Sequence, residues 1–197
     1  MNNVSLKGVI KDIEPSHTVK DIIFDKAKLL VPNPKGKEDV IDIKFKRFSN
    51  KYKDNDIVQL TGNIRSFSRK ISDTKNKVDI YVFTYFDEAT SEEFNEVNID
   101  GRICKIDNIR VTKSGKHNIH FIIANNINCE DNRRLNSYIP CLAWGKLAKE
   151  ISKLPVSTKI KIKGTLHSRE HKVYDSDNEM HISVAHEVIV DSYEVLE

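Results

Sequence analysis

Aromatic and basic side chains lie next to each other in the segment 138–150, YIPCLAWGKLAKE. The only tryptophan of the chain, Trp144, is followed directly by Gly145 and Lys146. An aromatic ring beside a cation at the edge of a sheet can stack a nucleobase and bind the neighbouring phosphate. Tryptophan is also common in protein cores. The elements that position Trp144 therefore decide between a base-stacking ring and a core ring.

The first part of this segment has the periodicity of a strand and the second part that of a helix. Alternation places Tyr138 and Trp144 on one face of the strand and Cys141 on the opposite face. Apolar residues then recur at helical spacing from Leu147 onward, with lysines between them, until Pro155 ends the helix. Trp144 thus comes at the junction of a strand and a helix.

The chain contains an internal repeat, which places this strand in the second of two similar domains. The segment VSLKGVI at 4–10 resembles VNIDGRI at 97–103, and IVQLTGNI at 57–64 resembles IKIKGTL at 160–166. The central glycine of the first pair indicates a bend, through which one strand can join two sheets and close a small barrel. Each unit spans about 90 to 100 residues, which is longer than the repeats of solenoid proteins. We therefore expect a repeated domain.

The order of predicted elements in the second half is three strands, a helix and two strands, which is the order of the OB-fold. The first half has no segment apolar enough for the same helix. The last strands are predicted at 78–83 and 180–184. We therefore predict an all-β protein with one short helix, built as two tandem five-stranded OB-fold barrels. The boundaries are 1–88 for a divergent first domain, 89–93 for a short acidic linker and 94–197 for the second domain.

Composition limits the chain to a few classes. With 39% hydrophobic and 31% charged residues, its 197 residues can form small cores under a polar surface. A net charge of +3 permits binding to a polyanion without requiring it. The odd set Cys104, Cys129 and Cys141 contains no CxxC pair, which argues against a disulfide framework and a cysteine-based zinc site. We find no signal-peptide pattern and no apolar run that could span a membrane, and expect a cytoplasmic, nucleoid-associated protein.

Five blocks of the second half, in their order and spacing, resemble the bacterial single-stranded DNA-binding protein family. They are VNIDGRI (97–103), TKSGK (112–116), FIIANN (121–126), AWGKLAK (143–149) and IKIKGTL (160–166). The first half carries only the first-strand and fourth-strand blocks. The resemblance implies OB-folds that bind single strands without chemistry and without strong sequence preference.

The resemblance also implies which residues stack bases and how chains assemble. The family places aromatic residues at the start and end of the third strand and after the fourth, which correspond here to Tyr138, Trp144 and His171. Histidine replaces the family's larger aromatic at the third place. Family members often place four OB-folds together, which this chain would reach as a homodimer. The acidic C-terminal tail that recruits replication proteins is not matched by the end of this sequence, so we do not expect recruitment of that kind.

Basic residues near the predicted strands are candidates for phosphate contacts, with a solvated surface charge as the alternative for each. In the second domain the predicted nucleic-acid-binding residues are Tyr138, Trp144, Lys146, Arg102, Lys113, Lys116, Arg169 and His171. In the first domain they are Lys44, Lys46, Phe48, Arg65, Phe67 and Arg69. Phe48 aligns with Trp144 in the repeat. The alternative for the first domain is a structural partner that does not touch nucleic acid.

No residue pattern indicates a metal site, a cofactor or a catalytic centre. His117 and His120 are three residues apart, which on a strand points them to opposite faces. His167 and His171 have no cysteine or carboxylate at ligand spacing. We predict a non-enzymatic protein that binds single-stranded DNA, with RNA also open, in DNA replication, recombination or repair. The alternative is an OB-fold adaptor of a replisome or primosome that mainly binds protein.

Overall fold

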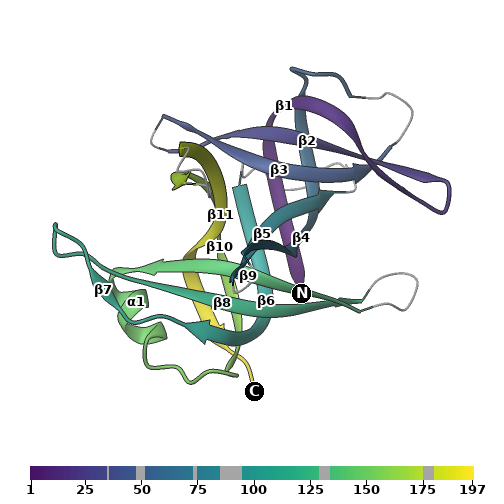
Figure 1. The fold of residues 1–197 in the computed structure, drawn as a ribbon. Helices are drawn as coiled ribbons and strands as arrows, with labels where there is room; N and C mark the ends of the chain where they lie inside the picture. Colours follow the sequence, from purple (N-terminus) through teal and green to yellow (C-terminus); the bar gives the residue numbers. More distant parts are fainter. Residues whose placement is uncertain (35, 48–51, 73–74, 85–94, 129–133, 175–179) are drawn as a thin grey trace.

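The computed structural model describes residues 1–34, 36–47, 52–72, 75–84, 95–128, 134–174 and 180–197. The first barrel consists of β1 (Asn2–Val19), β2 (Ile22–Pro32), β3 (Glu38–Lys46), β4 (Ile57–Ser72) and β5 (Lys75–Thr84). The second consists of β6 (Asn95–Ile106), β7 (Arg110–Val111), β8 (His117–Asn128), β9 (Arg134–Trp144), α1 (Gly145–Ile151), β10 (Lys159–Tyr174) and β11 (Met180–Val195). These are two OB-fold barrels in tandem, which confirms the predicted fold class (Figure 1).

In the second barrel the helix and the last strand end at other residues than the sequence predicted. Helix α1 ends at Ile151 and the chain continues to Pro155 in turns, because Leu154 donates its backbone N–H to the carbonyl of Ile151 rather than in the α-helical pattern. Strand β11 continues well past the predicted end, because Val188 is buried and pairs with Cys141 of β9 to close the barrel. Among the described residues, no helix has the length and hydropathy needed to cross a membrane.

The first strand of each barrel changes partners at its central glycine, as the sequence predicted. Strand β1 pairs with β4 up to Val9 and with β2 from Val9 onward. The two ladders meet beside Gly8, where a Cβ atom would lie 2.2 Å from the carbonyl oxygen of Leu30. Only a residue without a side chain therefore lets β1 join both sheets and close the barrel.

Replacing Gly8 by alanine should destabilise the protein because the new methyl group would meet backbone that cannot move independently of the sheet. We expect a loss of about 1–3 kcal/mol in the free energy of unfolding. Urea denaturation followed by circular dichroism measures it. Ser5→Ala in the same strand serves as the control and should change stability by less than about 0.5 kcal/mol. Equal stability of the two variants would contradict the close approach.

The two barrels share one continuous sheet. Strands β1 and β6 pair antiparallel, from Asn2 opposite Ile99 to Leu6 opposite Asn95, and join an eleven-stranded sheet. Equivalent residues of the two repeats occupy equivalent places in this pairing, since Val4 lies opposite Val97. The side-chain amide of Asn2 bonds the backbone N–H and carbonyl of Ile64, and that of Asn95 bonds the same groups of Leu166. The two domains are therefore related by an approximate two-fold axis at the β1–β6 pair (Figure 1).

Each long hairpin reaches across to the other barrel. The backbone N–H of Tyr138 donates to Ser66 Oγ of β4 at 2.8 Å, and the N–H of Val40 donates to Ser168 Oγ of β10 at 2.8 Å. The buried carboxylate of Asp39 accepts from the N–H of Ser168 at 2.8 Å and lies 3.0 Å from Nδ1 of His167. These contacts fix how the surfaces of the two barrels face one another.

Candidate nucleic-acid interface

Trp144 lies on the surface at the point where β9 turns into α1. Its neighbour Ala143 is fully buried, whereas 39% of the Trp144 surface is exposed. Gly145 has a φ of 60°, which turns the chain sharply into the helix and leaves the ring at the edge of the sheet. The ring lines a groove together with Gly115, Lys116, His117, Gly145, Lys146 and Lys149. An aromatic face and three lysines thus share one groove.

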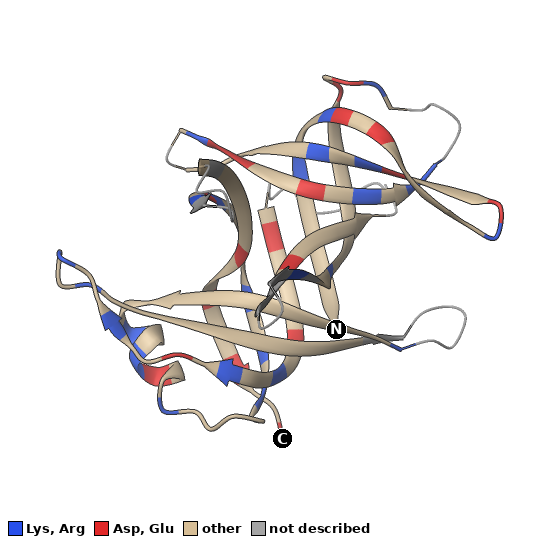
Figure 2. Ribbon diagram, viewed as in Figure 1, with Lys and Arg blue, Asp and Glu red and all other residues tan. Residues whose placement is uncertain are grey.

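A tight turn between β7 and β8 presents the lysines on the other side of this groove. The backbone N–H of Thr112 donates to the carbonyl of Lys116 at 2.8 Å, and Gly115 adopts a φ of 78°. Lys113 and Lys116 are both exposed. Lys146 is 91% exposed and lies 3.6 Å from Glu150, a weak surface pair that a phosphate can replace. Basic positions in this turn and on α1 lie at the same end of the second barrel (Figure 2).

Tyr138 lies at the other end of β9, about 20 Å from Trp144 at about 3.3 Å per residue. Its side chain is 44% exposed. Arg102 shares its face, because Tyr138 pairs with Ala124 and Ala124 pairs with Arg102. The Arg102 guanidinium also donates to the carbonyl of Ser157 at 3.0 Å. The structure therefore brings Tyr138 and Arg102 to one surface but separates them from the Trp144 groove.

Strand β10 carries the two remaining predicted residues of the second domain. Arg169 is exposed, and its Nε lies 3.9 Å from a carboxylate oxygen of Glu187. That carboxylate is also 3.5 Å from Nδ1 of His120. Glu187 therefore places a negative charge next to Arg169. Nδ1 of His171 is buried without a hydrogen-bond partner. A phosphate at Arg169 would have to compete with Glu187.

Strand register corrects one alignment within the repeat. Ile43 pairs with Val82 in the first barrel as Cys141 pairs with Val188 in the second. This equivalence places Lys46, not Phe48, at the position of Trp144. The predicted alignment was wrong by two residues because it compared segments of the chain without the strand pairing that anchors them. Phe48 itself lies outside the described residues, as does the side chain of Arg69.

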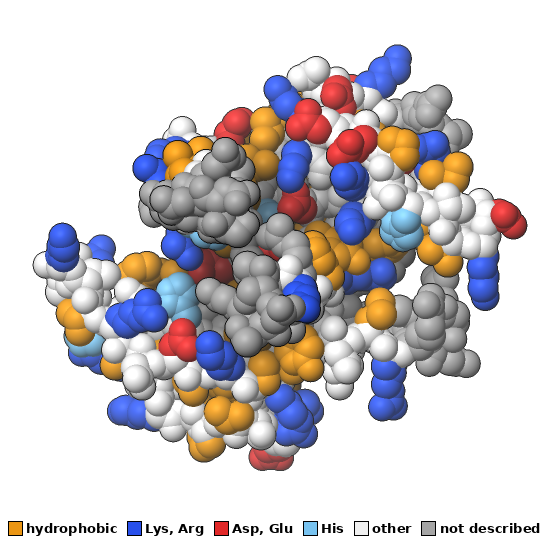
Figure 3. Space-filling view, viewed as in Figure 1, with side chains coloured by type: hydrophobic (Ala, Val, Ile, Leu, Met, Phe, Trp, Pro, Cys, Tyr) orange, Lys and Arg blue, Asp and Glu red, His pale blue; other side chains and the backbone are white. Residues whose placement is uncertain are grey.

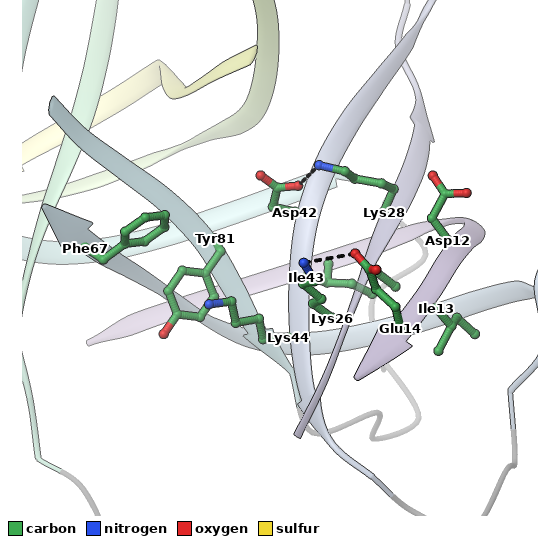
Figure 4. A pocket seen from close by; sticks show the side chains of 11 residues that line it. Asp12, Ile13, Glu14, Lys26, Lys28, Asp42, Ile43, Lys44, Phe67 and Tyr81 are labelled. Atoms are coloured by element: carbon green, nitrogen blue, oxygen red, sulfur yellow. Dashed lines mark hydrogen bonds and ion pairs between the residues drawn. The ribbon is translucent and has the colours of Figure 1, made fainter. Parts of the chain in front are cut away.

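The outer face of the first barrel gathers aromatic rings and cations. Lys44 and Phe67 line a groove with Tyr81, and the Lys44 ammonium lies 4.4 Å from the Tyr81 ring centroid and 5.5 Å from that of Phe67 (Figure 4). Burial lowers the pKa of Lys44, and the positive charge of Lys26 lowers it further. Burial raises the pKa of Tyr81, so its hydroxyl stays protonated at neutral pH. This groove therefore presents protonated phenol, phenyl and ammonium groups together.

A second cation–ring pair lies beside this groove. The Arg65 guanidinium carbon is 3.7 Å from the ring centroid of Phe83, and Phe83 lies 6.0 Å from the ring of Phe24. Tyr81, Phe83 and Phe24 were missed by the sequence analysis. The alternation of Tyr81, Val82 and Phe83 in a predicted strand was a signal that could have found two of them. Over β2 and β3, hydrophobic and charged side chains lie side by side on the surface (Figure 3).

The structure describes two of the three cysteines, Cys104, which is exposed, and Cys141, which is buried. Burial raises the pKa of the Cys141 thiol above its ordinary value, which keeps the sulfur protonated and unreactive. Within the part of the chain that the structure describes, no three His, Cys, Asp or Glu side chains lie close enough together to hold a metal ion. What the described surfaces offer is stacking on rings and ionic contact with lysine and arginine.

Residues 94–196 match a model of the single-strand binding protein family. Among solved structures, the wild-type single-stranded DNA-binding protein of Thermus aquaticus is similar to the whole chain, with a TM-score of 0.72 and 14% identity over 100% of this chain and 93% of that chain. A deletion mutant of the same protein gives a TM-score of 0.72 and 15% identity, covering 100% and 95%. A search of the curated proteins gives no match. At this identity the structural similarity establishes a shared fold.

Proposed function

The chain belongs to the single-strand binding protein family, and from this premise we propose that it binds single-stranded DNA without strong sequence preference. The observation that carries the proposal is the groove at the end of β9, where the exposed ring of Trp144 lies among Lys116, Lys146 and Lys149. A base stacked on an aromatic ring contributes roughly 1–3 kcal/mol whatever its identity. Binding of this kind is therefore tolerant of sequence.

The proposed mechanism is passive. Bases leave water for the rings of Trp144 and Tyr138, and lysines displace counterions from the phosphates. No bond is made or broken, so we propose a binding protein rather than an enzyme. Its role would be to protect single strands during replication, recombination or repair, in the compartment that holds the DNA.

Binding to dT oligomers of increasing length tests the function. We expect the affinity to rise with length until the oligomer spans the occupied surface, at roughly 4–16 nucleotides for each OB-fold in use. The fluorescence of Trp144, the only tryptophan, should be quenched on binding. Light scattering on the same samples gives the number of chains, since we propose a homodimer with four OB-folds. Absence of quenching at saturating oligomer, together with capture of a protein partner, would favour an adaptor instead.

A further inference from the structure

Two equivalent serines connect each domain to a strand of the other. Ser66 Oγ of β4 accepts the backbone N–H of Tyr138, and Ser168 Oγ of β10 accepts that of Val40, both at 2.8 Å. Each serine lies four residues after the glycine of the repeated strand block, and register places Val40 at the position of Tyr138. The two acceptors are therefore alike, whereas the residues they hold differ, because only Tyr138 has a ring.

The N–H of Tyr138 lies on the edge of β9 that faces away from β8. Among the described strands, β11 pairs with this edge only at Cys141 and Leu142. Tyr138 comes before that short parallel ladder, so its N–H has no strand to donate to there. A backbone N–H at such an edge requires another acceptor. Ser66 supplies this acceptor from the first domain.

The side chain of Tyr138 points away from the core. Its neighbours Ser137 and Ile139 are buried, whereas 44% of Tyr138 is exposed. Arg102 lies on the same face as Tyr138, two strands away. A base stacked on this ring therefore has a cation on the same surface for its phosphate.

The joint at Val40 is held by more than its serine. The Asp39 carboxylate accepts the N–H of that serine at 2.8 Å, and the Val40 carbonyl lies 2.9 Å from Nε2 of His186. By register, Ser137 takes the place of Asp39, and Ile80 takes that of His186. Isoleucine cannot donate a hydrogen bond and serine carries no charge. The joint at the start of β9 therefore depends more on its own serine.

A backbone that is already held lowers the cost of binding at Tyr138. A residue that becomes ordered only when the ligand arrives loses conformational entropy at that moment. The bond from the Tyr138 N–H to Ser66 orders the base of this side chain before a strand binds. Because the serine hydroxyl contacts the backbone of Tyr138, it acts through the tyrosine and not on the strand.

We propose that Ser66 is a positioning residue for Tyr138, so that the first domain completes the stacking site at the start of β9 in the second domain. This inference rests on the proposed function of the chain, because it takes Tyr138 as a residue that stacks a base. The site at Tyr138 then belongs to both domains, whereas the Trp144 groove is formed by the second domain alone.

The test removes the hydroxyl with Ser66→Ala. We expect dT oligomers of about 30 nucleotides to bind about fivefold more weakly, the change that one hydrogen bond ordinarily makes to an equilibrium. Ser66→Thr keeps the hydroxyl and should restore most of the affinity. Ser168→Ala is the matched control, because it breaks the equivalent contact at Val40, and should bind as the wild-type protein does. Circular dichroism confirms that each variant folds.

A double-mutant cycle shows whether the serine acts through the ring. Tyr138→Leu alone should weaken binding by about tenfold, because one stacking face is lost. Adding Ser66→Ala to Tyr138→Leu should then cause no further loss, since the two residues act as one unit. The quenching of Trp144 at saturating oligomer should be the same in all variants, because this ring lies at the other end of β9.

Four results separate the possible outcomes. Wild-type affinity in Ser66→Ala or in Tyr138→Leu would overturn the positioning role, and so would an equal loss from Ser66→Ala with and without the tyrosine. An equal loss in Ser168→Ala would also overturn it, because the effect would then be a general loosening of the joint between domains. Failure of the wild-type protein to bind any oligomer would overturn the proposed function itself.

Discussion

Raising the salt concentration from about 50 to about 200 mM should weaken the binding of long dT oligomers by about a hundredfold. For single strands the logarithm of the affinity falls by about 0.7 per phosphate contact for each tenfold rise in salt. About five contacts, supplied from the Trp144 groove and its neighbours, would give this loss. Titrations by fluorescence anisotropy at a series of salt concentrations measure the slope.

Single lysine variants identify which residues contribute to that slope. Lys146→Gln should reduce its magnitude by about 0.7, because one phosphate contact is lost. Lys161→Gln on the outer face of the shared sheet should leave the slope unchanged. A binding affinity that is flat with salt would contradict phosphate recognition and favour an apolar or protein ligand.

Replacing Trp144 by alanine should weaken binding by a factor of ten or more. The exposed indole offers a stacking face worth roughly 1–3 kcal/mol per base. Because the ring is partly exposed and does not belong to the buried core, the fold should persist. Anisotropy of a labelled dT oligomer measures the affinity, since this variant has no tryptophan to report binding.

Trp144→Phe separates stacking from the mere presence of a side chain. Phenylalanine keeps an aromatic face, so the affinity of this variant should lie much closer to that of the wild-type protein than to that of Trp144→Ala. An alanine variant that binds as tightly as the wild-type protein would show that the strand does not use this groove.

The two domains present different residues on their surfaces. In the second domain Trp144 and Tyr138, at the two ends of β9, are exposed at 39% and 44%. In the first domain Lys44, Phe67 and Tyr81 line a groove on the outer face. The family model matches residues 94–196, which lie in the second domain. It does not say which domain has more rings on its surface.

Sequence alone predicted most of the elements and the faces of their residues. Alternation has a period of two along any strand, so the opposite faces of Ile43 and Lys44, or of Ala143 and Trp144, follow from local order. The bend at Gly8 could likewise be predicted, because a residue without a side chain inside a strand signals a close approach.

Only the tertiary structure decided which strands are neighbours and in what register. The convergence of Phe24 with Phe67, Tyr81 and Phe83 depends on the pairing of β2 with β3 and of β3 with β5, and β2 and β5 are far apart in the chain, so spacing along the sequence carries no record of it. The same holds for Glu187 beneath Arg169 and for Lys46 in the place of Trp144. Strand alternation is local, whereas register is set by backbone hydrogen bonds between distant segments.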